Sequence, residues 1–235
     1  MTRTAALSAL AFLSACTTAS STDIKTSGLH ATITGTANGS GATEVSTTLQ
    51  LGPLSTTFVE LSGTDTLTAT SGSNTATLKK FALLGLVNYS ASLTGDEEGK
   101  SVTVALTRSG GDTSAPSSVL TLPAKFELTG PTAGATFKRG TDQIEVKWDT
   151  SGKPDTLTID LSGSCIETVS KTATDSGSLV IAGSELKASK DNETKTCDVT
   201  VTTKRTRAGT LDAAYGKGGS VSGVQVRTRS IKSAP

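Results

Sequence analysis

The chain has 235 residues, with 22 basic against 21 acidic side chains and a formal net charge of +1. This balance excludes a strong overall attraction to nucleic acid or to anionic surfaces. Aromatic residues make up only 3% of the chain, whereas glycine contributes 24 residues. The composition is typical of short strands joined by tight turns, and it offers few aromatic platforms for a sugar. We expect no nucleic-acid partner and no cofactor.

The first sixteen residues combine a basic head, a short apolar run and a cysteine. Residues 5–13 are apolar apart from Ser8. This run is too short to cross a hydrocarbon core about 30 Å thick, and its flanks are typical of a secretory signal. The sequence Leu-Ser-Ala-Cys at residues 13–16 resembles the lipobox of bacterial lipoproteins. The alternative is an ordinary signal with a chance cysteine.

The lipobox resemblance implies a signal peptide over residues 1–15 and a lipid, with fatty acids such as palmitate, on Cys16. The membrane would then be the direct partner of a lipid-anchored protein of the bacterial cell envelope. Residue 17 is Thr. In the enteric members of that family an Asp at this position resembles an inner-membrane retention signal, so the outer membrane is favoured. Residues 16–26 are polar with no apolar face, and we predict a lipidated, flexible tether there.

Alternating apolar and polar residues predict strands throughout the first half of the mature chain. The clearest cover 29–34, 45–51 and 102–107. One-sided strands, separated by turn signals about every 8–12 residues, favour an antiparallel β-sandwich. We assign the first sandwich to residues 27–122. The longest apolar run, at 80–89, predicts a core strand or a short crossover within it.

The same alternation predicts a second sandwich over residues 123–235, with the boundary near Pro123. Its clearest strands cover 144–148, 157–161, 197–202 and 224–227. The fold class is therefore all-β, with two tandem antiparallel sandwiches after the signal peptide.

One stretch of the second half resembles immunoglobulin-like surface modules, through Pro131, Gly134, Gly140 and Trp148. The resemblance implies that the proline and glycines shape the first turn and that the tryptophan fills the core.

The stretch "GTLDAAYGKGG" at 209–219 is similar to the delta-60 repeats of exported bacterial proteins. Those repeats occur in tandem, whereas this chain has one copy, so no repeat fold follows. We predict a long hairpin loop between the last two strands. Leu211 and Tyr215 would tuck back against the protein.

Two cysteines remain if Cys16 carries a lipid. In an oxidising envelope Cys165 and Cys197 are expected to form a disulfide. Two free buried thiols or a metal pair are the alternatives, although the pair falls short of the four ligands of a structural zinc site. Because Trp148 precedes both cysteines, the bridge is not expected to be the inter-sheet bridge of antibody domains.

Candidate catalytic and metal-binding residues are few. His30 is the single histidine, and the chain has no Gly-x-Ser-x-Gly nucleophile motif to accompany it. Asp96, Glu97 and Glu98 lie in a predicted hairpin turn. A solvated turn is favoured there over a calcium site, because the alternating spacing of a dedicated calcium loop is missing.

The C-terminal part of the chain is rich in basic residues. Lys204, Arg205, Arg227 and Arg229 form a candidate anion-binding patch for envelope glycans or lipid headgroups. The alternative is a solvated sheet edge whose charges discourage aggregation.

Together these features predict a non-catalytic surface or periplasmic protein, acting as an adhesion, scaffold or interaction module. Its partner would be an envelope protein or glycan. The alternative is a hydrolase, or the carbohydrate- or anion-binding accessory module of one.

Overall fold

The computed structural model describes residues 17–235. The predicted signal peptide and the lipid site at Cys16 lie outside the described residues. Within residues 17–235 the chain forms strands and three short 3-10 helices, η1 (Ser21–Asp23), η2 (Thr26–Gly28) and η3 (Gly183–Glu185). No helix in this part of the chain has the length and apolar character needed to span a membrane.

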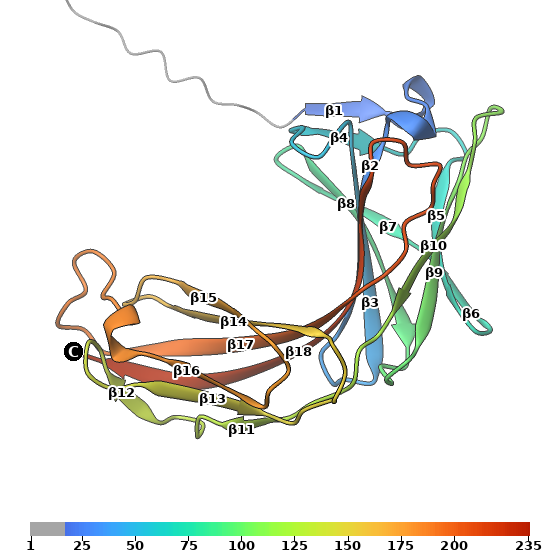
Figure 1. The fold of residues 1–235 in the computed structure, drawn as a ribbon. Helices are drawn as coiled ribbons and strands as arrows, with labels where there is room; N and C mark the ends of the chain where they lie inside the picture. The colour runs from blue at the N-terminus through green and yellow to red at the C-terminus, as the bar shows by residue number, and fades with distance from the viewer. Residues whose placement is uncertain (1–16) are drawn as a thin grey trace, which may run out of the picture.

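The first sandwich has two layers (Figure 1). One layer contains β1 (Thr17–Ser20), β4 (Thr57–Glu60), β3 (Ala42–Gln50), β2 (His30–Ala37), the start of β18 (Gly219–Ala234), β8 (Leu86–Thr94) and β7 (Lys79–Leu83). The other contains β10 (Ala115–Thr121), β9 (Ser101–Thr107), β5 (Thr66–Ser71) and β6 (Asn74–Thr77).

The second sandwich is built in the same way. One layer contains β12 (Thr136–Lys138), the end of β18, β17 (Cys197–Ala208), β14 (Thr156–Gly163) and β15 (Val169–Ala173). The facing layer contains β11 (Leu128–Gly130), β13 (Ile144–Trp148) and β16 (Ser178–Ile181). The expected all-β sandwich fold is confirmed.

The predicted strand faces are confirmed for most strands. The exception is 224–227, where Gln225 is fully buried and Val226 is only partly buried. Along β2 the even-numbered residues stay partly exposed while Ala31 and Ile33 are fully buried, and the same alternation holds along β9, β13 and β14. Trp148 is 3% exposed and lies in the second core, as the resemblance to immunoglobulin-like modules implies. Gly134 and Gly140 adopt positive φ values of 74° and 77° in the turns flanking β12, a conformation that glycine adopts at little cost.

The two sandwiches share one continuous sheet. The hairpin of β17 and β18 runs from the second sandwich into the first, and Figure 1 shows these long strands linking the two bodies. The Gly219–Gln225 part of β18 pairs with β2, whereas the Lys232–Ala234 part pairs with β12. The loop at 209–218 therefore returns to the first sandwich. Tyr215 and Val221 are buried in the first core, beside residues from 29–122.

Within residues 17–235, three strand pairs are parallel rather than antiparallel: β1 with β4, β2 with β18, and β12 with β18. Each pair joins segments connected through other strands rather than by a tight turn, as parallel pairing requires. Local alternation predicts each strand's faces but carries no information on these distant partners.

The flexible tether predicted up to residue 26 is wrong for Thr17 onwards. Strand β1 pairs with β4 from Thr17 to Ser20, and Ser21 and Thr26 are fully buried. The hydroxyl of Ser21 donates to the Asp65 carboxylate at 2.7 Å, and that of Thr26 donates to the Thr113 carbonyl at 2.5 Å. The segment is ordered by strand pairing, by hydroxyl hydrogen bonds and by Ile24, which packs against the first core.

The apolar run at 80–89 also differs from its prediction. Only its second half reaches the core, through Val87 and Tyr89. The first half forms β7, which pairs with β8 alone, and every residue of β7 is exposed. An apolar sequence predicts burial but does not reveal that a hairpin extends beyond the opposing sheet.

Candidate functional site

The most elaborate polar arrangement surrounds the crossover between the two sandwiches, residues 122–127. Three arginines from the β17–β18 hairpin bind this segment: Arg205, Arg207 and Arg227. We call these three residues the junction clamp. They lie on the strands that pass through both sandwiches, so the clamp fixes the crossover against the shared sheet.

Arg205 is the centre of the clamp and is fully buried. Its Nη1 donates to the carbonyl oxygens of Ala124 and Lys125 at 3.0 and 3.2 Å. Its Nη2 lies 2.9 Å from an Asp175 carboxylate oxygen, and the guanidinium stacks 4.8 Å from the centroid of the Phe126 ring. The Nε of Arg205 is buried without a hydrogen-bond partner, so the bonds of Nη1 and Nη2 and the Asp175 carboxylate must offset the cost of burying the charge.

Asp175 is the matching buried anion. Besides Arg205, its carboxylate accepts hydrogen bonds from the Trp148 indole at 2.8 Å and from the backbone N–H and hydroxyl of Ser151. Burial alone raises the pKa of Asp175, but the hydrogen bonds from Ser151, Trp148 and Arg205 outweigh burial and lower it. The Asp175 carboxylate therefore stays charged at neutral pH.

The other two clamp residues bind the ends of the crossover. Arg207 makes a two-pronged ion pair with Asp155, at 2.8 and 2.7 Å, and donates to the Leu122 carbonyl at 3.3 Å. Arg227 also lies over Phe126, with its guanidinium carbon 5.5 Å from the ring centroid. Its Nε is 3.4 Å from a Glu127 carboxylate oxygen.

The acidic turn at 96–98 is part of the same junction. Asp96 is buried, and its carboxylate pairs with Lys125 at 2.6 Å. The hydrogen bond from Lys125 is the main factor that lowers the pKa of Asp96. Glu98 pairs with Lys153 of the second sandwich. The turn therefore links the two sandwiches, and the favoured interpretation as a solvated turn is wrong for Asp96.

The candidate anion-binding patch does not form as predicted. Arg205 is buried, and Arg227 and Arg229 share its inward side of the sheet. Arg229 donates to the carbonyl oxygens of Pro131 and Leu128. Lys204 lies on the opposite side and pairs with Asp160 at 3.0 Å. These cations are used to hold carbonyl and carboxylate groups of the protein itself.

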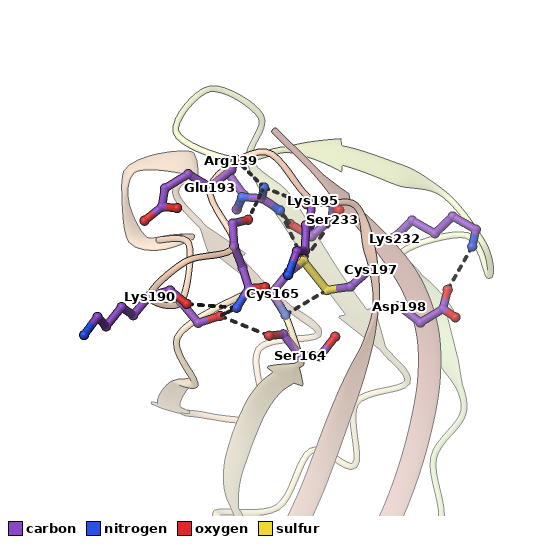
Figure 2. Close-up of a disulfide and its surroundings, with 12 residues drawn as sticks. Arg139, Ser164, Cys165, Lys190, Glu193, Lys195, Cys197, Asp198, Lys232 and Ser233 are labelled. Atoms are coloured by element: carbon purple, nitrogen blue, oxygen red, sulfur yellow. Dashed lines mark hydrogen bonds and ion pairs between the residues drawn. A yellow bond between two sulfur atoms is a disulfide. The ribbon is translucent and has the colours of Figure 1, made fainter.

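The disulfide between Cys165 and Cys197 is present, with Cα atoms 5.8 Å apart (Figure 2). It joins the loop after β14 to the start of β17, which neighbour each other in one sheet. The bridge is therefore not inter-sheet, as predicted from the position of Trp148. Figure 2 shows Arg139 beside it, where the guanidinium donates to the Cys165 sulfur at 3.3 Å and to the Lys195 carbonyl at 2.8 Å.

The remaining candidates are dispersed. His30 lies at the surface of the first sandwich, with Nδ1 3.1 Å from the Lys217 carbonyl oxygen. A surface depression of about 800 Å³ lies between residues 22–27, 108–113 and 213–216. Its one buried cation, Arg108, is held by Asp65 at 2.9 Å and by Asp112 at 3.1 Å. Among residues 17–235 no cluster of histidine, cysteine or carboxylate side chains has the arrangement of a metal site.

Sequence reasoning missed the junction clamp, although one signal was present. Continuing the alternation of Val199 and Val201 along β17 places Thr203 and Arg205 on the core side, where an arginine needs a buried partner. The identity of that partner, Asp175, depends on tertiary packing and has no local signal.

No protein-family model matches the chain, and no curated protein matches its sequence. Among solved structures, the FN1–FN3 domains of chicken CNTN1 are similar at 10% identity and a TM-score of 0.30, over 86% of this chain and 63% of that one. A 1.5-MDa bacterial ice-binding adhesin is similar at 12% identity and a TM-score of 0.23, over 86% of this chain and 65% of that one. At these TM-scores the likenesses support no argument about function, and the fold assignment depends on the sheets described above.

Proposed function

We propose that this protein is a lipid-anchored, non-catalytic interaction module of the bacterial cell envelope, built as a stiff two-sandwich spacer. The lipid is placed on Cys16, and the outer membrane is the favoured location because Thr follows the cysteine. A partner, an envelope protein or a glycan, would be held at a fixed distance from the bilayer.

The junction clamp is the observation that carries this proposal. Flexible domain pairs are joined by exposed polar linkers with few crossing contacts. Here the crossover is bound by three arginines, two strands pass through both sandwiches, and the Asp96–Lys125 and Glu98–Lys153 pairs join them further. A module that must present a partner at a defined position benefits from this construction, because fewer conformations are lost on binding.

Replacement of Cys16 by serine tests the anchoring. In cell fractionation, the wild-type protein should be found with the membranes. Mass spectrometry of its N-terminal peptide should show the lipid mass on Cys16. The Cys16→Ser protein should move to the soluble fraction, because its acyl chains are lost. A Cys16 thiol without a lipid in the membrane-isolated protein would refute the proposed anchor.

A capture experiment tests the interaction role. The soluble chain from Thr17 onward, immobilised through its C-terminus, should retain a specific envelope component from detergent extracts. Turnover of a substrate by the purified chain at enzyme-like rates would instead support the hydrolase alternative.

A further inference from the structure

The β7–β8 hairpin carries the largest concentration of exposed apolar side chains in the described part of the chain. Phe81, Leu83, Leu84 and Leu86 are 63%, 56%, 88% and 50% exposed. The cross-strand pairs Phe81–Asn88 and Leu83–Leu86 place three of them on one face of the hairpin, opposite Val87 and Tyr89, which enter the core. Water-soluble surfaces seldom gather apolar groups in this way without a partner.

The turn of this hairpin has a leucine where its backbone conformation disfavours one. Leu84 and Gly85 both have positive φ, 49° and 82°. Two-residue turns of this kind favour Asn or Asp before Gly, because leucine is disfavoured at positive φ. A large apolar residue therefore occupies the most projecting position of the hairpin in spite of its backbone conformation.

The hairpin reaches the end of the first sandwich where the described chain begins. Strand β1, which starts at Thr17, lies in contact with β8 and pairs with β4. Figure 1 shows the β7–β8 hairpin reaching towards this end of the sandwich. The loop between β3 and β4 lies there too, through the Thr17–Thr57 pair, and it exposes Leu54 to 96%.

Thr17 follows Cys16 directly, and a trans peptide separates neighbouring Cα atoms by about 3.8 Å. Because β1 is bonded to β4 from Thr17 onward, there is no slack between the lipid site and the folded body. A lipid on Cys16 would hold this end of the sandwich at the bilayer surface. This step rests on the proposed lipid anchor.

We propose that the tip of the β7–β8 hairpin, with Leu54, inserts into the interfacial region of the lipid bilayer. Phe81, Leu83, Leu84 and Leu86 would enter the acyl boundary, as the apolar faces of interfacial segments do. The lipid and the hairpin then form two attachment points, which fix the orientation of the rigid body on the membrane as well as its position.

Residues 17–235 contain both cores and the disulfide, so the chain from Thr17 onward can be used as a probe. An N-terminal histidine tag attaches Thr17 to phosphatidylethanolamine–phosphatidylglycerol vesicles that contain a nickel-chelating lipid, without any need for Cys16. With the disulfide closed, Leu84→Cys supplies the one free thiol for a polarity-sensitive fluorophore. Ser73→Cys, on the β5–β6 turn far from β1 in Figure 1, is the matched control.

On attachment, the emission of the label at position 84 should shift to the blue and be quenched by lipids brominated on their acyl chains. The label at position 73 should keep its emission in water. A label at 84 that stays water-like on attached protein would overturn the proposal. A blue shift without vesicles that grows with protein concentration would also overturn it, since it would assign the hairpin to a second copy of the chain.

A double variant provides a second readout. Phe81→Ser with Leu84→Asn should reduce several-fold the fraction of the histidine-tagged chain that co-sediments with vesicles containing little nickel-chelating lipid, whereas Val180→Ser, at an exposed apolar site of the second sandwich, should leave it unchanged. Asn is tolerated at positive φ, so the variant is expected to fold. If Cys16 carries no lipid, mass spectrometry of the N-terminal peptide will show it. The label emission and the co-sedimentation still test the hairpin, because neither measurement uses Cys16.

Discussion

Arg205 shows how one residue can decide the role of a whole segment. By composition it belongs to a basic C-terminal region, and it was a candidate for binding an external anion. In the structure its guanidinium is fully buried against Phe126, Asp175 and the crossover carbonyls. The alternation along β17 predicts that Arg205 faces the core. Its partner could not be predicted, because Asp175 lies 30 residues away, between β15 and β16.

Arg205→Met should destabilise the protein by about 3–5 kcal/mol, because it leaves the Asp175 carboxylate buried without its cation. Urea unfolding followed by circular dichroism measures the change. Lys204→Met, the neighbouring residue on the outer face, removes a partly exposed ion pair and should change the unfolding free energy by at most about 1 kcal/mol. Equal changes in unfolding free energy for the two substitutions would contradict the stabilising role of the buried Arg205–Asp175 pair.

Acid should weaken the protein through Asp65 and Asp175. The pKa of each lies below its usual value in the folded chain, since hydrogen bonds outweigh the effect of burial. Their stabilisation is therefore complete above about pH 4 and is lost as the pH falls through the lower folded values. The unfolding free energy should decrease below about pH 4, and Asp175→Asn should flatten this dependence. A variant with the unchanged acid slope would rule out Asp175 as a contributor.

At the scale of elements, most strands and their buried faces could be predicted from alternation, and so could the disulfide from the count of cysteines. The exceptions have physical causes. Segment 17–26 is ordered largely by strand pairing and hydroxyl hydrogen bonds, which hydropathy does not register. The β7 strand is apolar but has no opposing layer to cover it. Parallel partners such as β2 and β18 depend on the path of the whole chain.

The disulfide should stabilise the second sandwich. It closes a segment of 32 residues, for which the chain-entropy model gives about 3–4 kcal/mol. Cys165→Ser with Cys197→Ser should lower the unfolding free energy by that amount in denaturant titrations. Lys190→Ala, an exposed change within the same closed segment, is the control. An unchanged midpoint for the double serine variant would show that the loop is already restrained without the bridge.

At the scale of the molecule, the two sandwiches are interdependent. The first core needs Tyr215 and Val221, and β2 needs the Gly219–Gln225 part of β18 as its neighbour. A chain of residues 17–122, which contains all the strands of a simple tandem first domain, should therefore fail to give a cooperative thermal transition. The chain of residues 17–235 should unfold in one transition. A well-folded 17–122 fragment would contradict this interdependence.

A distance distribution shows whether the junction clamp and the shared sheet hold the two sandwiches as one rigid body. Spin labels at Ser73→Cys in the first sandwich and Thr172→Cys in the second, on the chain from Thr17 onward, report it through pulsed dipolar spectroscopy. We expect a single narrow distribution that broadens when Arg205→Met is added. A broad or multi-peaked distribution in the protein with its clamp intact would contradict it.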